Sequence, residues 1–144
     1  MKTKILIVED NPDCRKIFGF YLRNMGYEPI EAQDGREGIY YAKNSRPDLI
    51  ILDWGLPDMN GLDVLALIKQ DSTTSGIPVV VLTAMAMDNI RIKAIQAGAA
   101  AFLVKPTSPV VLDEIIKMVL DPTLSTFHAG LPGKKQITQP HVSA

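Results

Sequence analysis

Three carboxylates in this 144-residue chain stand where two short apolar runs end. Glu9 and Asp10 follow the run Ile5–Val8, and Asp53 follows the run Leu49–Leu52. Runs of branched apolar residues are typical of strands buried in a parallel sheet, and ligands bind beyond the carboxyl ends of such strands. Carboxylates that meet there repel one another unless a hard cation with a preference for oxygen joins them, and Mg²⁺ fits best. The sequence therefore predicts a magnesium site at this edge.

A hydroxyl and an ammonium group are expected at the same edge. Thr83 ends another apolar run with the small residue Ala84 after it, and Lys105 follows a further run. A hydroxyl can donate a hydrogen bond to a phosphoryl oxygen, a lysine acts on it as a point charge, and Ala84 leaves room for the group. With a carboxylate nucleophile and a metal, these groups suit in-line phosphoryl transfer to Asp53.

Strand-like and helix-like segments alternate along the chain, and this alternation must position the chemical groups. The first helix is predicted from an apolar stripe with helical spacing, formed by Cys14, Ile17, Phe18, Tyr21, Leu22 and Met25. Further helices are predicted over Gly35–Asn44, Leu62–Gln70 and Asp88–Ala97, and a last helix is entered by Ser108-Pro109 and left through Asp121-Pro122. The strands are predicted over Ile5–Val8, Pro29–Ala32, Leu49–Leu52, Val79–Thr83 and Ala101–Val104. Such alternation predicts a doubly wound α/β fold, with a five-stranded parallel sheet covered by helices on both faces.

One domain is expected, from residue 1 to residue 121. From residue 122 to residue 144 the composition becomes rich in Pro, Gly and polar residues without an apolar period, which predicts a flexible tail. About two dozen residues are too few for a second core, so no output domain is expected there. His128 and His141 lie in this tail without cysteines or an acidic cluster beside them, so they are interpreted as solvated residues.

The composition excludes several classes of partner. Hydrophobic residues make up 47% and charged residues 22%, as in globular domains, and the net charge of -1 predicts no direct binding to nucleic acid or to a membrane surface. Cys14 is the only cysteine and cannot form an internal disulfide. Because no apolar stretch has the length of a membrane span and the start leads straight into a strand, a cytoplasmic location is expected.

Four motifs, in order and each at a predicted strand end, resemble those of a known family. The sequence from residue 3 to residue 121 is similar to the receiver domains of two-component response regulators, of which the chemotaxis protein CheY is typical. The resemblance implies the flavodoxin-like strand order 2-1-3-4-5. It rests on Val8-Glu9-Asp10-Asn11, Asp53-Trp54-Gly55-Leu56-Pro57-Asp58-Met59-Asn60-Gly61, Thr83-Ala84 and Gly98-Ala99-Ala100-Ala101-Phe102-Leu103-Val104-Lys105-Pro106.

The resemblance also implies roles at the predicted metal site. Asp53 would be the phosphoacceptor, which takes a phosphoryl group from the phosphohistidine of a sensor histidine kinase or of a phosphotransfer protein. Asp10 would bind Mg²⁺ directly, Glu9 would hold it through water, and Gly55 would offer its backbone carbonyl. Glu9 stands where many members have Asp, which leaves direct contact with the metal as the alternative. Lys105 would contact the phosphoryl group.

A switch is implied as well. Thr83 would move to bond the phosphoryl group, and Phe102 occupies the position of the aromatic switch in the family. Ala84 and Pro106 flank the phosphoryl site. The protein would then be a phosphorylation-dependent switch that changes its affinity for a downstream partner, as a monomer or a phosphorylation-dependent dimer, and not a dedicated turnover enzyme. The sequence does not name the partner.

Two other functions would use part of the same set of residues. A phosphohydrolase of the haloacid dehalogenase type also uses an Asp nucleophile and Mg²⁺, but it needs a second Asp two residues later, where this chain has Gly55. A receiver-like interaction module that accepts no phosphate is disfavoured because every chemical position is filled. Dinucleotide binding is not supported, since no G-x-G-x-x-G motif follows the first strand.

Some residues also have a structural interpretation, which for Asp10 is disfavoured by the presence of Glu9 and Asp53. Asp10 could be a helix N-cap, and Phe102 could be a plain core residue. Asp58 and Asn60 are interpreted as turn formers without chemistry. Trp54 fits either the wall of the cleft or an anchor for a partner. A docking surface and ordinary helix packing both remain open for the apolar group Met85, Met87 and Ile90.

Overall fold

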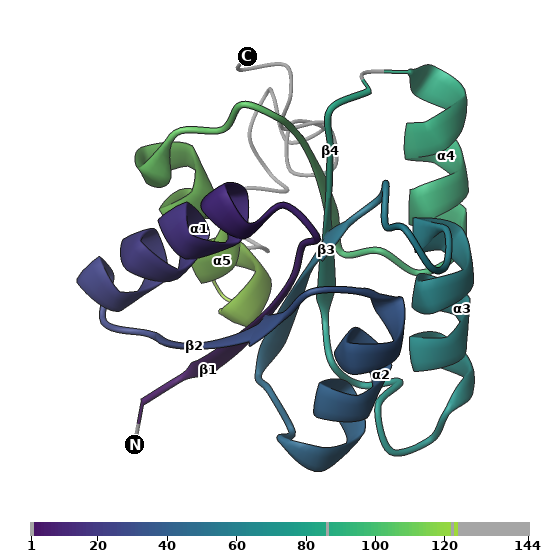
Figure 1. Ribbon diagram of the computed structural model, residues 1–144, viewed down its shortest axis with the longest axis horizontal. Coiled ribbons are helices and arrows are strands. Elements are labelled where there is room, and N and C mark those ends of the chain that lie inside the picture. The colour runs from purple at the N-terminus through teal and green to yellow at the C-terminus, as the bar shows by residue number, and fades with distance from the viewer. Residues whose placement is uncertain (1, 86, 122, 124–144) are drawn as a thin grey trace.

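A computed structural model describes residues 2–85, 87–121 and 123 and contains one parallel sheet flanked by helices (Figure 1). The sheet order is β2-β1-β3-β4-β5, and all four strand pairs are parallel, which confirms the predicted topology. The predicted elements are all present, with ends shifted by at most two residues. Their bounds are β1 Lys4–Val8, α1 Pro12–Asn24, β2 Glu28–Ala32, α2 Gly35–Asn44, β3 Leu49–Asp53, α3 Gly61–Gln70, β4 Val79–Thr83, α4 Asp88–Gln96, β5 Ala101–Val104 and α5 Pro109–Leu120.

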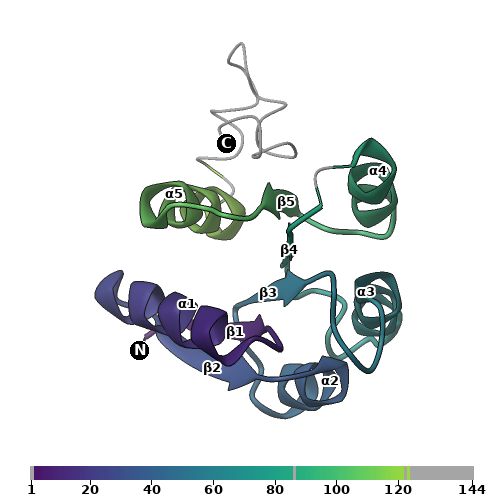
Figure 2. The same cartoon turned by 45° about the horizontal axis from the view of Figure 1, so that its top comes forward.

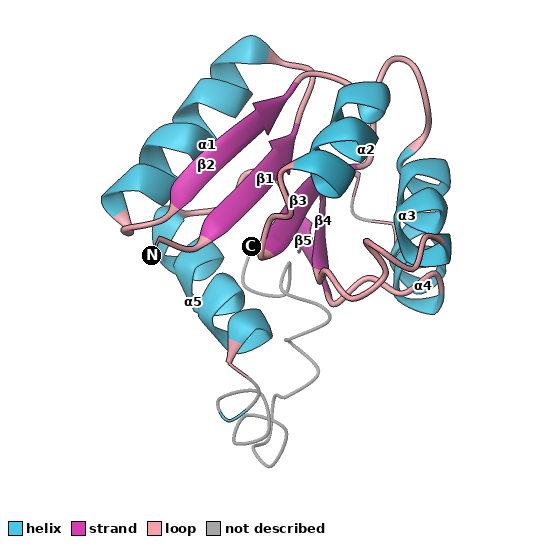
Figure 3. Cartoon of the chain, turned by 90° about the horizontal axis from the view of Figure 1, so that it is seen from below, coloured by secondary structure: helices cyan, strands magenta, loops and turns pink. Residues whose placement is uncertain are grey.

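Helices cover both faces of the sheet. Helices α1 and α5 lie on one face, and α2, α3 and α4 lie on the other (Figures 2 and 3). Successive strand residues point to opposite faces. Ile5 and Ile7 of β1 accordingly pack toward α1 and α5, whereas Leu6 and Val8 pack toward the other three helices. The sheet therefore has a core on each face, and its carboxyl edge is left for the polar residues.

The first residues of two helices decide which polar groups remain for the site. Helix α1 is capped by Asn11, whose Oδ1 accepts a hydrogen bond from the amide of Cys14 at 3.0 Å. The alternative in which Asp10 serves as the N-cap is therefore wrong, and the Asp10 carboxylate is available for other contacts. Asn60 caps α3 by accepting a hydrogen bond from the Asp63 amide at 2.9 Å, as its position before the helix predicts.

The buried face of α1 is narrower than the apolar stripe predicts. Ile17 belongs to that stripe but is 49% exposed, whereas Phe18, Gly19 and Leu22 are buried. The helix approaches β2 closely at Gly19, where a Cβ atom would lie 3.0 Å from the Glu31 carboxylate. Ile17 therefore contributes to the surface, and spacing along one helix does not reveal which part of an apolar stripe stays buried.

The predicted tail, with His128 and His141, lies outside the described residues except for Thr123. The division of the chain into a domain up to residue 121 and a flexible tail therefore stays a prediction. Among the residues that the structure describes, none of the helices has the length and apolar character needed to cross a lipid bilayer.

Candidate functional site

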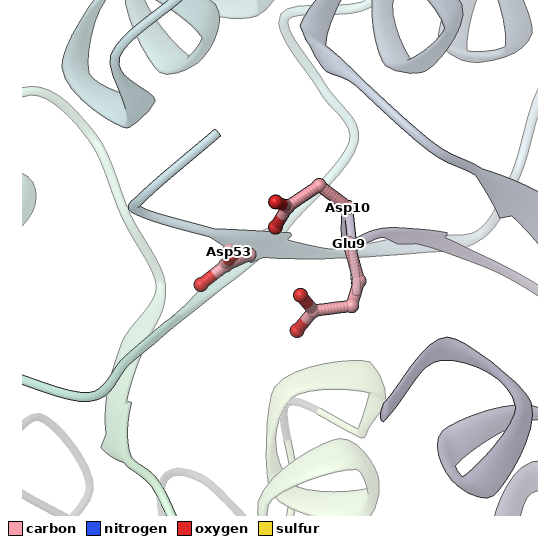
Figure 4. A group of neighbouring side chains, drawn as sticks. All are labelled: Glu9, Asp10 and Asp53. Atoms are coloured by element: carbon pink, nitrogen blue, oxygen red, sulfur yellow. The ribbon is translucent and has the colours of Figure 1, made fainter. Parts of the chain in front are cut away.

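The three predicted carboxylates meet at the carboxyl edge of β1 and β3. Val8 of β1 pairs with Leu52 of β3, so the next residues, Glu9 and Asp53, stand side by side. One carboxylate oxygen from each of Glu9, Asp10 and Asp53 lies within 4.8 Å of the others (Figure 4). Glu9 and Asp53 are buried, whereas Asp10 is exposed. Asp53 is itself the last residue of β3, which holds its backbone in the sheet.

Lys105 joins two of these carboxylates. It follows β5, and its side chain reaches past β4 toward β3 and β1. Its Nζ donates a hydrogen bond to Glu9 Oε1 at 2.6 Å and lies 3.3 Å from Asp53 Oδ1. The side chain of Lys105 is 20% exposed, so most of it is shielded from water. The cation therefore offsets part of the repulsion between the two buried carboxylates.

Burial and charge shift the proton affinities of this pair. Burial raises the pKa of the Glu9 carboxyl above its usual 4.5; the hydrogen bonds from Lys105 and from the Asn11 amide oppose that shift, and repulsion from Asp53 adds to it. Burial alone would lower the pKa of Lys105, but its interactions with Glu9 and Asp53 outweigh burial and raise it above 10.5. The ammonium group thus stays charged. The remaining repulsion among the carboxylates is unfavourable, and a further cation would reduce it.

Lys105→Met is expected to destabilise the fold by about 1–3 kcal/mol at neutral pH. The value lies below that for fully buried pairs because water reaches part of the group. Between 4.5 and the raised pKa of Glu9, the folded state holds more protons than the unfolded state, so stability falls as pH rises through this window. Without the ammonium group that pKa rises further and the window widens. Urea unfolding should therefore show a loss that shrinks as the pH falls toward 4.5.

The exposed residue Lys93 of α4 provides the matched control. Lys93→Met removes the same charge and leaves the carboxylates paired, so its unfolding free energy should match that of the wild type at each pH. Equal losses for both variants, or a Lys105→Met loss that is independent of pH, would show that Lys105 does not offset the carboxylate charge.

The predicted hydroxyl lies at the same edge of the sheet. Thr83 ends β4 in register with Val104 of β5, and its carbonyl accepts a hydrogen bond from the Lys105 amide at 2.7 Å. The side chain is buried, and Oγ1 accepts a hydrogen bond from the Met85 amide at 3.1 Å. The neighbouring residue Ala84 is exposed. The hydroxyl is thus held by its own loop in this structure.

The loop after Asp53 places Trp54 and Gly55. The Trp54 amide donates to the Leu82 carbonyl at 2.9 Å, and the ring lies so close to Gly61 that a Cβ there would be 2.7 Å from Cε3. Trp54 is half-buried against the core, which favours the cleft wall over a free anchor. Gly55 is exposed, and a Cβ built on it would meet no atom within 4 Å. After β5, a cis peptide joins Lys105 to Pro106.

Phe102 lies inside the core on the face of α2, α3 and α4, with 1% of its surface exposed. Its packing is that of a core residue, and its predicted role as a switch stays a prediction. Met85 and Met87 are 53% and 49% exposed, whereas Ile90 packs partly against the core. The two methionines therefore contribute to the surface near Thr83, and Ile90 contributes to packing.

Sequence reasoning missed a residue that holds the backbone of the acidic loop. Arg15 of α1 donates through Nη1 to the carbonyl of Glu9 at 2.9 Å and to that of Asp10 at 3.4 Å. Its Nε lies 3.5 Å from Glu31 of β2, which helps to orient the guanidinium group. Arg15 stands inside a helix, so a search for polar residues at strand ends could not find it.

Asp58 also has a larger structural role than the sequence predicts. Its Oδ1 accepts a hydrogen bond from the Gly35 amide at 2.8 Å, and its Oδ2 accepts one from the Arg36 amide at 3.0 Å. It therefore links the loop after β3 to the first turn of α2. The interpretation as a mere turn former is incomplete, because contacts between residues so far apart in the sequence follow from the tertiary fold.

Comparisons with known proteins agree with this geometry. The sequence profile of the response regulator receiver domain matches residues 5–117. The chain is 38% identical over 120 residues to the polar-differentiation response regulator DivK of Brucella anthropi, with 83% of this chain and 98% of that protein covered. The receiver domain of a sensor histidine kinase from Pseudomonas aeruginosa, solved with a magnesium ion in its active-site cleft, superposes with a TM-score of 0.78 at 30% identity over 83% of this chain and 98% of that one.

Longer proteins match as well. The phosphate regulon transcriptional regulatory protein PhoB of Klebsiella pneumoniae is 38% identical over 120 residues, which are 83% of this chain. The chain spans about half of the length of that relative, since 52% of PhoB is covered. The similarity therefore concerns only the matched half of PhoB.

Proposed function

This chain belongs to the response regulator receiver domain family, whose members are phosphorylation-dependent switches of two-component systems, and on that premise we propose that Asp53 is its phosphoacceptor. An oxygen of the Asp53 carboxylate would form a bond to phosphorus while the bond from phosphorus to the donor's histidine nitrogen breaks. The electron pair of that bond would leave with the imidazole. The donor would be a sensor histidine kinase or a histidine phosphotransfer protein.

The position of Lys105 is the observation that carries this proposal. Its Nζ lies 3.3 Å from Asp53 Oδ1 in a shielded place, and it is held there by Glu9. A phosphoryl group on Asp53 brings further negative charge to this place, and a preorganised cation stabilises charge that develops during transfer. We assign Lys105 this role and Thr83 the role of a hydrogen-bond donor to the phosphoryl group, with Ala84, Trp54 and Pro106 around it.

The donor set fits Mg²⁺. Three carboxylates whose oxygens lie within 4.8 Å of one another offer the hard oxygen ligands that this ion prefers. We propose that Asp10 and Asp53 bind the ion directly, Glu9 through water, and Gly55 through its carbonyl. When bound, Mg²⁺ supplies positive charge that offsets the carboxylates and the phosphoryl oxygens. The magnesium ion in the cleft of the Pseudomonas aeruginosa domain supports this assignment.

The proposed switch starts at Thr83. Its hydroxyl accepts a hydrogen bond from the Met85 amide. A movement of Thr83 that lets the hydroxyl donate to the phosphoryl group would break this bond and release the start of the loop toward α4. Phe102 would respond next, and the surface formed by α4, β5 and α5 would change its affinity for a partner protein. A shift from mostly off to mostly on requires about 5 kcal/mol of differential interaction, which a dianionic group bonded by Thr83 and Lys105 would have to supply.

Several finer assignments complete the proposal. The protein would assist only its own phosphorylation and dephosphorylation, in keeping with a family of signalling switches. It would act in the cytoplasm, as a monomer or as a dimer that forms on phosphorylation, with residues 1–121 as the receiver unit. Its downstream target would be a protein, without direct contact to nucleic acid or membrane.

Phosphorylation by a small donor tests the function. The chain is expected to gain one phosphoryl mass when it is incubated with acetyl phosphate and millimolar Mg²⁺. No kinase is needed, because the proposed acceptor and the groups around it all belong to this chain. Excess chelator should lower the yield at least about tenfold, since the acidic cluster would then repel the incoming phosphate. Intact-mass spectrometry measures both yields. Labelling that is equal with and without Mg²⁺ would refute the metal assignment, and no labelling under either condition would refute the acceptor.

A further inference from the structure

The loop between β3 and α3, residues 54–60, is held at its ends and in its middle. Its ends are closed by a hydrogen bond from the Gly61 amide to the Trp54 carbonyl at 3.0 Å. In the middle, the Leu56 side chain is buried, and the two carboxylate oxygens of Asp58 bind the start of α2. Gly55 lies between these points on an open surface. The position of its backbone therefore depends on how firmly the rest of the loop is held.

The contact between Asp58 and α2 fits closely. Asp58 accepts hydrogen bonds from the amides of Gly35 and Arg36, both in the first turn of the helix. A Cβ on Gly35 would lie 3.1 Å from Asp58 Oδ1 and from the Met59 sulfur, and 3.0 Å from Val64 of α3. A glycine at this position thus allows the loop and the helix to meet.

Electrostatics stabilise the same contact. The amides at a helix N-terminus lack partners within the helix and carry the positive end of its dipole, which favours a carboxylate there. Partial desolvation would raise the pKa of Asp58, but hydrogen bonds from the Gly35 and Arg36 amides and from its own loop outweigh it and lower the pKa below 3.8. The carboxylate therefore remains ionised at neutral pH, although the side chain is exposed.

We propose that Asp58 is a positioning residue that anchors the β3–α3 loop to α2 and so fixes the backbone carbonyl that Gly55 offers to the metal. This inference rests on the proposed magnesium site. It assigns a role in metal affinity to a residue that does not belong to the acidic cluster. Outer-shell residues that orient ligands commonly change metal affinity by about 10–100-fold when they are replaced. Because Asp58 acts through three residues of backbone, a smaller effect is expected.

Asp34 provides a matched control. It is the N-cap of the same helix, since its Oδ1 accepts a hydrogen bond from the Glu37 amide at 2.9 Å, and it does not belong to the β3–α3 loop. Asp34→Ala therefore weakens α2 much as Asp58→Ala does, but it leaves the loop anchored. A difference between the two variants reports the anchoring and not the stability of the helix.

The experiment titrates the full chain with Mg²⁺ alone and follows the fluorescence of Trp54, the only tryptophan. Asp58→Ala should weaken Mg²⁺ binding about threefold to tenfold, whereas Asp34→Ala should bind as the wild type does. Asp58→Asn keeps the size of the side chain and one acceptor oxygen, so it should fold and show a smaller loss. Affinities equal to that of the wild type in both Asp58 variants would overturn the inference.

Hydrogen exchange of the metal-free protein gives a second readout. Asp58→Ala should speed exchange at the amides of Gly35 and Arg36 and also within residues 54–60, whereas Asp34→Ala should act on the Glu37 amide and leave the loop unchanged. Loop exchange equal to that of the wild type in Asp58→Ala would overturn the anchoring. A wild type that fails to respond to Mg²⁺ would refute the proposed metal site instead, and the exchange rates would still decide whether Asp58 holds the loop.

Discussion

Asp53→Asn is expected to abolish phosphoryl incorporation from acetyl phosphate, with a loss of at least about 100-fold in yield. The amide has nearly the same shape as the carboxylate, but it lacks the anionic oxygen that must form the bond to phosphorus while acetate leaves with the electron pair of the broken bond. Intact-mass spectrometry under conditions that label the wild type measures the result.

The same variant should fold at least as well as the wild type, which makes the loss of labelling a chemical result. Repulsion from Asp53 contributes to the raised pKa of Glu9, so removal of that charge relieves the buried cluster. Lys105 keeps its hydrogen bond to Glu9 at 2.6 Å. A thermal unfolding temperature equal to or above that of the wild type is therefore expected.

Asp63→Asn is the matched control for the acceptor. Asp63 is an exposed carboxylate in the first turn of α3, ten residues after Asp53. Its replacement should leave incorporation unchanged. A phosphoryl mass on Asp53→Asn that equals the wild-type yield would place the acceptor elsewhere, and a loss in both variants would point to a general effect of charge.

Polar residues that directly follow the apolar runs predicted the centre of the candidate site, because parallel strands align their carboxyl ends. Glu9 and Asp53 meet since β1 and β3 pair in register, and Lys105 arrives from β5 because its long stem spans the intervening strand. The types of residue and their order along the chain were sufficient for this prediction, since the parallel topology brings the strand ends to one edge of the sheet. The two groups that support the site from outside, Arg15 and Asp58, were not predicted.

The supporting residues escaped prediction for a physical reason. The carboxylate of Asp58 reaches amides 23 and 22 residues earlier in the chain, at Gly35 and Arg36, and only the packing of α2 against α3 brings them together. Arg15 lies on a side of α1 that faces the acidic loop, whereas Ile17 of the same helix is exposed. Periodicity predicts that a helix has a buried face, but side-chain contacts with β2 set the angle of that face.

Phe102→Ala is expected to lower the free energy of unfolding by about 3–5 kcal/mol. The ring is 1% exposed and belongs to the core cluster with Val81, Ala94 and Ala99, so truncation leaves a cavity that strand and helix backbones cannot close. Domains of this size are commonly stable by only about 5–15 kcal/mol, and the variant would lose a large part of that. Urea unfolding followed by circular dichroism gives the value.

The same burial sets a condition on the proposed switch at Phe102. Moving the ring out of the core would cost about 1.5–3 kcal/mol in exposed apolar surface, a cost that phosphorylation of Asp53 would have to exceed. Phe102→Leu keeps most of the packing and removes the aromatic ring. If the ring serves only the core, this variant should show the wild-type response of Trp54 fluorescence to phosphorylation and the wild-type pattern of hydrogen exchange in β5. If the ring moves, the variant should be labelled normally at Asp53, while the change in exchange at β5 on phosphorylation is lost.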